Sequence, residues 1–150
     1  MVKHSDECYT PAWVFDALGV QFDLDVCGPK TGACVPALKT YTIEDDGLSM
    51  PWGGCVWMNP PFSKPRPWVK KFMAHGNGIA LLPFAKSQWF NDLLETDPLL
   101  AVLDPKIRFT KDGRQHSIFM AVGLFGIGSA ARDAFARFRE YTKASKVCHP

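Results

Sequence analysis

The segment Asn59-Pro60-Pro61-Phe62 has the residue types needed for chemistry on a planar amino group. The side-chain carbonyl of Asn59 and a main-chain carbonyl, that of Pro60, are two acceptors for the two N–H bonds of such a group, and proline adds no competing donor. Two acceptors pull a nitrogen whose lone pair is delocalised into a ring toward tetrahedral geometry, where it becomes a nucleophile. The Pro-Pro geometry is rigid, and Phe62 offers a flat face on which a flipped-out base stacks.

The position of this segment matters because the four residues also fit an ordinary exit from a strand into a loop. Asn59 directly follows Cys55-Val56-Trp57-Met58, a continuous apolar run typical of a buried parallel strand. Ligands of α/β sheets bind at the carboxyl ends of such strands. The position therefore favours a catalytic site.

The rest of the chain alternates predicted strands and helices that would hold this segment. Thr10 followed by Pro11 predicts an N-cap and a first helical turn, with Gly19 as the stop signal. Further helices are expected over Trp68–Met73, Ser87–Leu94 and 130–141, and strands over Phe22–Val26, near Lys39–Thr42, and over Cys55–Met58, Ile79–Leu82 and Leu99–Leu103.

The pattern changes after Asp104-Pro105. Ile107–Thr110, the turn Lys111-Asp112-Gly113 and the run 117–122 predict an antiparallel hairpin. We therefore expect an α/β fold: a compact Rossmann-like sandwich with a mostly parallel sheet and a C-terminal antiparallel hairpin, forming one domain over residues 1–150.

Composition narrows the function without identifying it. The net charge of +2 gives no basic field over the whole molecule, so any nucleic-acid footprint must be local. Neither a membrane-spanning stretch nor a signal peptide is visible, which predicts a cytoplasmic protein without membrane attachment. The five cysteines form no Cys-x-x-Cys pair, so we expect no metal site.

An ordered series of segments resembles the phage-type DNA N6-adenine methyltransferases of the Dam-like family. The similarity runs over nearly the whole chain, and its strength lies in the order of the matches. The matching segments are Tyr9–Phe15, Phe22–Val26, Cys34, Tyr41, Glu44–Leu48, Trp52, Asn59–Ser63, Trp68-Val69, Leu82-Pro83, Trp89-Phe90 and Ile107–Phe109.

The resemblance implies a methyltransferase that uses S-adenosylmethionine to methylate N6 of adenine in DNA. Tyr9, Thr10 and Pro11 resemble the segment beside the methionine end of the cofactor, although a plain helix start fits them equally. Asp25, followed by Gly28, resembles the acid at the end of the first strand that opens the cofactor site. A carboxylate there is suited to pair, directly or through water, with the cofactor's ammonium group, and the alternative is a solvated aspartate at a strand end.

A second acidic position follows from the same resemblance. Asp46, before Gly47-Leu48, resembles the acid that accepts a hydrogen bond from the cofactor's adenine amino group. Asp45 competes for this role, Glu44 is near enough to do so as well, and a solvated acidic turn is the alternative.

The chain departs from the family's pattern in its cofactor region. No Phe-x-Gly-x-Gly loop follows the first predicted strand, and about twenty residues separate Asp25 from Asp46, where a helix and a strand would normally intervene. The cofactor region is thus abbreviated, and no acid can be assigned to the ribose hydroxyls. Phe62 replaces the commoner tyrosine, which removes a hydroxyl and keeps the stacking face.

Basic residues near the catalytic segment suggest contacts with double-stranded DNA. Lys64 and Arg66 follow the segment immediately, and Arg108, Lys111 and Arg114 form a second group in the predicted hairpin. Such side chains bind flanking phosphates. With no room for a recognition domain, base reading must come from loops, which predicts a short or relaxed target sequence.

Lys70 and Lys71 lie one helical turn further on and fit a solvated helix face better than a phosphate site.

Other functions fit the same residues. A catalytically silent nucleic-acid-binding module would keep the scaffold and explain the abbreviated cofactor region. Methylation of a glutamine amide in a protein, or of adenine in RNA, would use the same Asn-Pro-Pro geometry. Resemblance to phage enzymes suggests the cytoplasm of a bacterial host and a role in restriction evasion or regulation.

Overall fold

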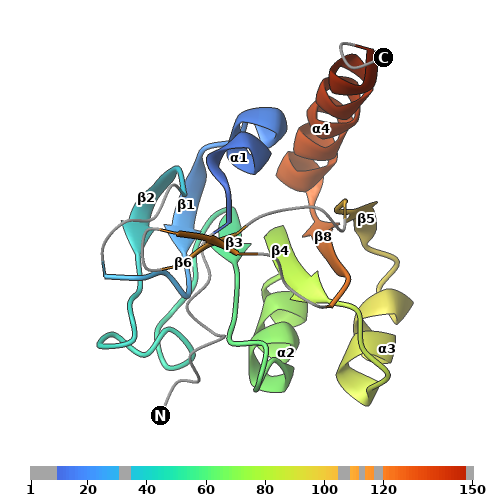
Figure 1. Cartoon of the computed structure of the whole chain (residues 1–150). Helices are drawn as coiled ribbons and strands as arrows, with labels where there is room; N and C mark the ends of the chain where they lie inside the picture. The colour runs from blue at the N-terminus through green and yellow to red at the C-terminus, as the bar shows by residue number, and fades with distance from the viewer. Residues whose placement is uncertain (1–9, 31–34, 105–108, 112–113, 117–119, 148–150) are drawn as a thin grey trace.

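The apolar runs of the sequence form the centre of a six-stranded mixed sheet in the computed structural model, which describes residues 10–30, 35–104, 109–111, 114–116 and 120–147 (Figure 1). Four helices accompany the sheet. The helices are α1 (Ala12–Leu18), α2 (Arg66–His75), α3 (Gln88–Glu95) and α4 (Ser129–Val147). The strands of the sheet are β1 (Phe22–Asp25), β2 (Ala37–Thr40), β3 (Val56–Met58), β4 (Gly78–Pro83), β5 (Leu99–Val102) and β8 (Val122–Ile127).

The strand order is β2-β1-β3-β4-β8-β5. β1 pairs in parallel with both β2 and β3, and β3 pairs in parallel with β4, so these four strands end at one edge. β8 lies antiparallel between β4 and β5. The chain leaves β1 toward β2 on one side and then crosses to β3 on the other, so the strand order reverses at β1.

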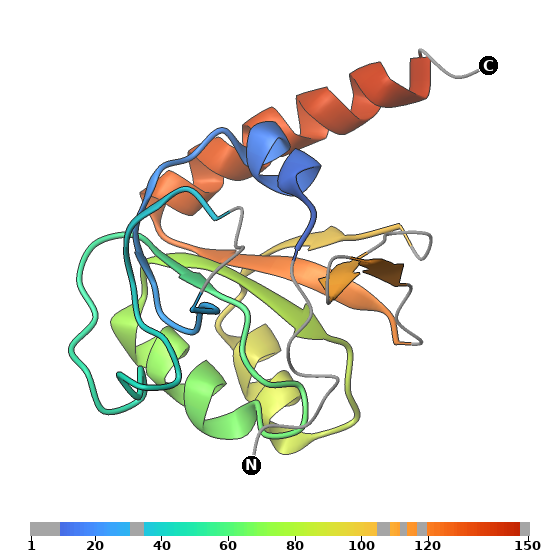
Figure 2. The ribbon, with the colours of Figure 1, turned by 60° about the vertical axis from the view of Figure 1, so that its left-hand side comes forward.

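Helices cover both faces of the sheet, with α1 and α4 on one face and α2 and α3 on the other (Figure 2). Successive side chains of each strand point to opposite faces of the sheet, so they pack alternately against the two helix layers. In β3, Trp57 packs in the cluster under α1 and α4, whereas Val56 and Met58 pack in the cluster under α2 and α3. The α/β class predicted from the alternating pattern is confirmed, and the sheet is compatible with a methyltransferase-like fold.

Several predicted boundaries are wrong. α1 begins at Ala12 with Pro11 as its N-cap, so Thr10 does not cap the helix as expected. β5 lies at an edge of the sheet and is half-exposed, although its apolar run predicts a buried strand. α4 continues to Val147, beyond the expected end near Tyr141.

The C-terminal hairpin is present with a different second strand. β6 (Phe109–Lys111) pairs antiparallel with β7 (Arg114–His116) and forms a separate two-stranded sheet. The prediction placed the second strand over 117–122, of which 117–119 lie outside the described residues. Val122 instead begins β8, which belongs to the main sheet. Because β8 is antiparallel to both neighbours, the main sheet has three parallel and two antiparallel pairings.

Candidate active site

The site is built where the two central parallel strands end. Asp25 is the last residue of β1, and Asn59 follows directly after β3. The strands are in register with Asp25 opposite Trp57, and the Val26 N–H donates to the Trp57 carbonyl over 3.1 Å. The two predicted site residues therefore leave the same edge of the sheet on adjoining strands, at the point where the strand order reverses. Open α/β sheets bind ligands at such a point.

Asp25 is a buried acid. Its exposed fraction is 1%, and its Oδ1 accepts a hydrogen bond of 3.2 Å from the Cys27 N–H. Burial raises the pKa of Asp25 from 3.8 to about 7, and the Cys27 hydrogen bond opposes that shift. The solvated strand-end aspartate considered from the sequence is thus wrong, because this carboxylate is withdrawn from water.

Gly28 lies against the Asp25 carboxylate. A Cβ atom on Gly28 would lie 2.6 Å from Asp25 Oδ2 and would also collide with Cγ2 of Thr40. The Gly28 N–H donates to the Tyr41 carbonyl over 2.9 Å, which fixes this approach. A larger residue here would displace one of these side chains, so the chain lies close around the acid.

The catalytic segment leaves β3 partly covered. Pro60 is buried, whereas Asn59, Pro61 and Phe62 are half-buried. Phe62 packs against the cluster under α1 and α4 and keeps part of its ring accessible. The Lys64 N–H donates to the Pro61 carbonyl over 3.2 Å, and this turn leads into α2. The turn therefore holds Phe62 between the sheet edge and the first residues of that helix.

Thr10 is a buried polar residue at the start of α1. It is 5% exposed, and its hydroxyl has no hydrogen-bond partner among the residues that the structure describes. α1 itself packs on the central strands, with the Phe15 ring centred 4.8 Å from that of Trp57. A buried hydroxyl without a partner is costly, so Thr10 is a candidate for a ligand contact. Tyr9, predicted beside it, lies outside the described residues.

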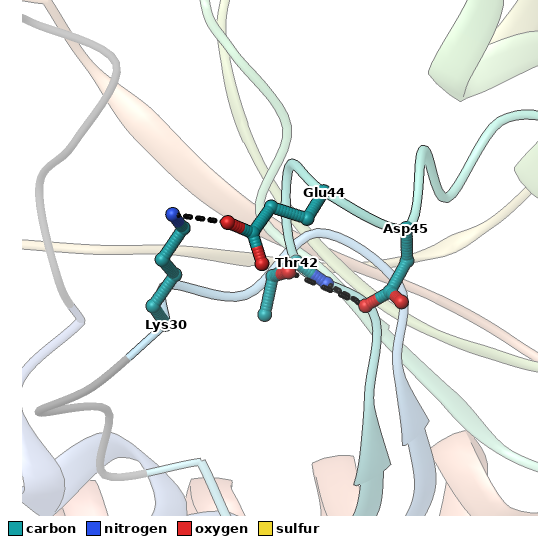
Figure 3. A network of polar contacts seen from close by, with 4 residues as sticks. All are labelled: Lys30, Thr42, Glu44 and Asp45. Atoms are coloured by element: carbon teal, nitrogen blue, oxygen red, sulfur yellow. Dashed lines mark hydrogen bonds and ion pairs between the residues drawn. The ribbon is translucent and has the colours of Figure 1, made fainter.

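The acidic loop after β2 uses its three acids differently, and Figure 3 shows two of them, Glu44 and Asp45. Asp45 Oδ2 accepts the Thr42 N–H over 2.8 Å and the Thr42 hydroxyl over 3.3 Å, which closes the turn. Glu44 forms an exposed ion pair of 2.6 Å with Lys30. Asp46 has a left-handed backbone, with φ of 55°, and its Oδ2 accepts the Ser49 hydroxyl over 2.6 Å.

The loop that follows Asp46 is anchored from α2, a contact that the sequence did not predict. Lys71 Nζ donates to the carbonyls of Leu48, over 2.8 Å, and Met50. The same ammonium group lies over the Trp52 ring, and Trp52 Nε1 donates to the Gly47 carbonyl over 2.8 Å. The expected solvated role of Lys71 is therefore wrong. The sequence held one indication of this contact. Lys71 directly precedes Phe72, so it lies next to the buried side of α2.

The predicted phosphate-binding residues fall into two groups. Lys64 and Arg66 are exposed at the start of α2, next to the catalytic segment. Lys111 and Arg114 are opposite each other where β6 and β7 meet, whereas Arg108 lies outside the described residues. The described residues therefore put Lys64 and Arg66 near Asn59.

Two features are absent from the described parts of the chain. No group of three or more His, Cys, Asp or Glu side chains there could hold a metal ion. No helix in those parts combines the length and apolar character needed to cross a membrane.

Comparison with known proteins identifies the family. A buried acid and an Asn-Pro-Pro-Phe segment on adjoining strand ends of an α/β sheet fit the class of amino-group methyltransferases. The chain belongs to the family described as DNA N-6-adenine-methyltransferase (Dam), whose model matches residues 1–118.

Two phage proteins show the similarity in detail. The chain is 31% identical over 93 residues to the DNA N-6-adenine-methyltransferase of Haemophilus phage HP1, covering 55% of this chain and 53% of that protein. It is 30% identical over 104 residues to the DNA N-6-adenine-methyltransferase of Escherichia phage T1, covering 65% of this chain and 43% of that protein. The matches thus span about half the length of these relatives. No solved structure matches the chain.

Proposed function

We propose that the chain transfers a methyl group from S-adenosylmethionine to N6 of adenine in double-stranded DNA, on a Rossmann-like scaffold. The observation that carries this proposal is that Asn59 and the buried Asp25 lie at the ends of adjoining strands, where the strand order reverses. Family membership and the two phage relatives support the same reaction.

The residues around Asp25 fit the methionine end of this cofactor. Asp25 is a buried carboxylate suited to pair with an ammonium group, and an incoming cation would favour its ionised form. Because Gly28 has no side chain, its backbone can lie directly beside that carboxylate. The unpartnered hydroxyl of Thr10 supplies a further polar contact, with Pro11 and Tyr9 beside it in the chain. When bound, the cofactor supplies a methyl group on a positively charged sulfur.

Asp46 is the proposed acceptor for the cofactor's adenine amino group. Asp45 uses one oxygen for two hydrogen bonds that close the turn, and Glu44 is paired with Lys30. Asp46 is exposed, and among the described residues its carboxylate accepts a hydrogen bond only from the nearby Ser49 hydroxyl. These contacts favour Asp46 over Asp45 and Glu44.

The catalytic segment would act directly on the target amine. Asn59 Oδ1 and the Pro60 carbonyl accept the two N6 hydrogens and draw the lone pair out of the ring. Pro61 keeps the segment rigid, and the accessible part of Phe62 stacks on the flipped base, a contact worth about 1–3 kcal/mol. S-adenosylmethionine, when bound, would supply the methyl group. Asn59 and Pro60 would hold N6 while it accepts that group, and one N6 proton would pass to water.

Flanking phosphates would be held by the basic residues on either side. Lys64 and Arg66 lie directly after the catalytic segment, and Arg108, Lys111 and Arg114 belong to the hairpin region.

Transfer of a labelled methyl group tests the proposed function. The substrates are a DNA duplex with adenine, a duplex in which adenine is absent from both strands, the matching RNA and an unrelated protein. Label only in the adenine-containing DNA supports the proposal. Binding of DNA without transfer would indicate a silent binding module, and label in RNA or protein would indicate one of the other amino-methyltransferase functions.

A further inference from the structure

The C-terminal helix α4 is longer than the sheet that it covers. Its first half packs on the sheet through Ala131, Ala134, Phe135 and Phe138, which are all buried. Nineteen helical residues extend about 28 Å, whereas the six residues of β4 extend about 20 Å. α4 starts at the edge where β8 ends and runs back over the sheet, so its second half projects past the sheet in the direction in which β4 points (Figure 2).

This helix concentrates the positive charge of the chain. It contains five Lys and Arg residues and two acids, a net charge of +3, whereas the whole chain has +2. The remaining 131 residues therefore have a net charge of −1. The net positive charge of the chain therefore comes from α4.

Three of the basic residues share one face of α4. Arg132, Arg139 and Lys143 are separated by seven and four residues, the spacing that aligns side chains along a helix, and all three are exposed. Lys143 contacts Glu140 at 3.5 Å, but their side chains are 74% and 78% exposed, so water screens the pair. The basic face of α4, defined by these three residues, is therefore available to an anionic partner.

Arg137 differs from the basic face although it belongs to the same helix. Its Nε donates to the Leu18 carbonyl over 2.8 Å, which joins α4 to the end of α1. It lies five residues from Arg132, more than a quarter-turn around the helix from that side chain. Arg137 thus joins two elements of the fold, whereas among the described residues the side chains of the basic face form no hydrogen bond to another element.

We propose that the basic face of α4 binds the phosphate backbone of duplex DNA next to the target base. The proposal rests on the proposed function, which makes DNA the substrate. Figure 2 shows the projecting half of α4 and the hairpin of β6 and β7 on the same side of the sheet, the side of the carboxyl ends of β3 and β4. Closely spaced phosphates match a row of exposed cations along one helix face. The family match ends at residue 118, so this face lies outside it.

Salt-dependent DNA binding by the full chain tests the proposal. Fluorescence anisotropy with a labelled adenine-containing duplex gives the slope of log Kd against log salt concentration for the wild type, Arg139→Gln, Lys143→Gln and Arg137→Gln. Each of the first two should lower the slope by about one and weaken binding uniformly across DNA sequences. Arg137→Gln removes the same charge from another face and should leave the slope unchanged.

The outcomes separate this proposal from the proposed function. An unchanged slope in Arg139→Gln and Lys143→Gln, an equal change in all three variants, or no measurable DNA binding by the wild type would overturn the role of α4. If the wild type methylates DNA and Arg139→Gln and Lys143→Gln have the same salt slope as the wild type, the proposed function is supported and the role of α4 is contradicted. If the slopes change as expected but no label is transferred, the face binds DNA and the proposed reaction fails. Cofactor affinity by calorimetry should be equal in all variants.

Discussion

The ammonium group of Lys71 lies 5.0 Å from the centre of the Trp52 ring, and Trp52 Nε1 donates in turn to the Gly47 carbonyl. Lys71 also donates to the carbonyls of Leu48 and Met50. Because α2 follows the catalytic segment, these contacts join that segment to the loop after Asp46 through one helix.

Lys71→Met should lower the free energy of unfolding by about 1–3 kcal/mol, because two carbonyls would lose a charged donor. Urea denaturation measures the effect. Lys70→Met is the matched control, since Lys70 is the preceding residue of the same helix and is exposed. Equal losses in the two variants would show that the contacts of Lys71 contribute nothing specific.

Asp25→Asn should stabilise the free protein in a pH-dependent way. The folded pKa of about 7 lies above the ordinary 3.8, so the native state holds a proton that the unfolded chain releases. The stability from this group is full below about pH 4 and is lost as pH rises through about 7. The neutral variant avoids that loss and should exceed the wild type by on the order of 4 kcal/mol at about pH 8, with little difference at about pH 4.

Urea denaturation at both pH values tests this expectation, with Asp16→Asn, at an exposed position of α1, as the control. A difference that stays constant with pH would contradict the burial of a titrating Asp25. The same variant should bind S-adenosylmethionine more weakly, because it lacks the charge proposed to pair with the ammonium group.

Gly28→Ala should disturb the chain around Asp25. The added methyl group would meet the carboxylate and Thr40, so these side chains or the backbone must shift, at a cost of about 1–3 kcal/mol. Both thermal stability and cofactor affinity by calorimetry should fall. Gly53→Ala is the matched control, since nothing lies within 4 Å of its added Cβ. Undiminished cofactor affinity in Gly28→Ala would remove this segment from the proposed site.

Asp46→Gly should raise the cofactor Kd roughly tenfold or more, the loss expected for one hydrogen bond to a charged acceptor. Glycine suits the left-handed backbone at this position, so the fold should persist. Calorimetry with S-adenosylmethionine gives the Kd. An affinity equal to that of the wild type would transfer the role to Asp45 or Glu44.

The central strands were predictable because a strand buried on both faces consists of consecutive apolar residues. β3 and β4 have only buried residues, and both were expected within a residue or two of their observed bounds. Asp25 and Asn59 were each expected at the carboxyl end of a strand, whereas the pairing of those two strands came from the structure. That residues 1–150 form one domain stays a prediction.

β8 was missed because its glycines weaken the strand signal. Val122-Gly-Leu-Phe-Gly-Ile127 contains two residues that strands disfavour. A Cβ on Gly126 would lie 2.8 Å from the Phe135 ring and 2.9 Å from the Ala131 Cβ, so glycine lets α4 pack closely on the sheet. This reason depends on a helix later in the chain, which a local pattern cannot reveal.

Two features of the site could not be predicted from local sequence patterns. The anchoring of the acidic loop by Lys71 joins residues more than twenty positions apart. The buried hydroxyl of Thr10 looked like an N-cap because threonine before proline commonly begins a helix. Tertiary packing decided both cases.

The measurement that tests the account most directly is methyl transfer to an adenine-containing DNA duplex by Asn59→Ala. Asn59 is proposed to hold the reacting amine, so transfer should fall by at least about a hundredfold. The unfolding curve of the variant shows whether the loss exceeds what any change in stability explains. Asn91→Ala, at an exposed position of α3, should keep full activity. Transfer by Asn59→Ala at the wild-type rate would contradict the proposed mechanism.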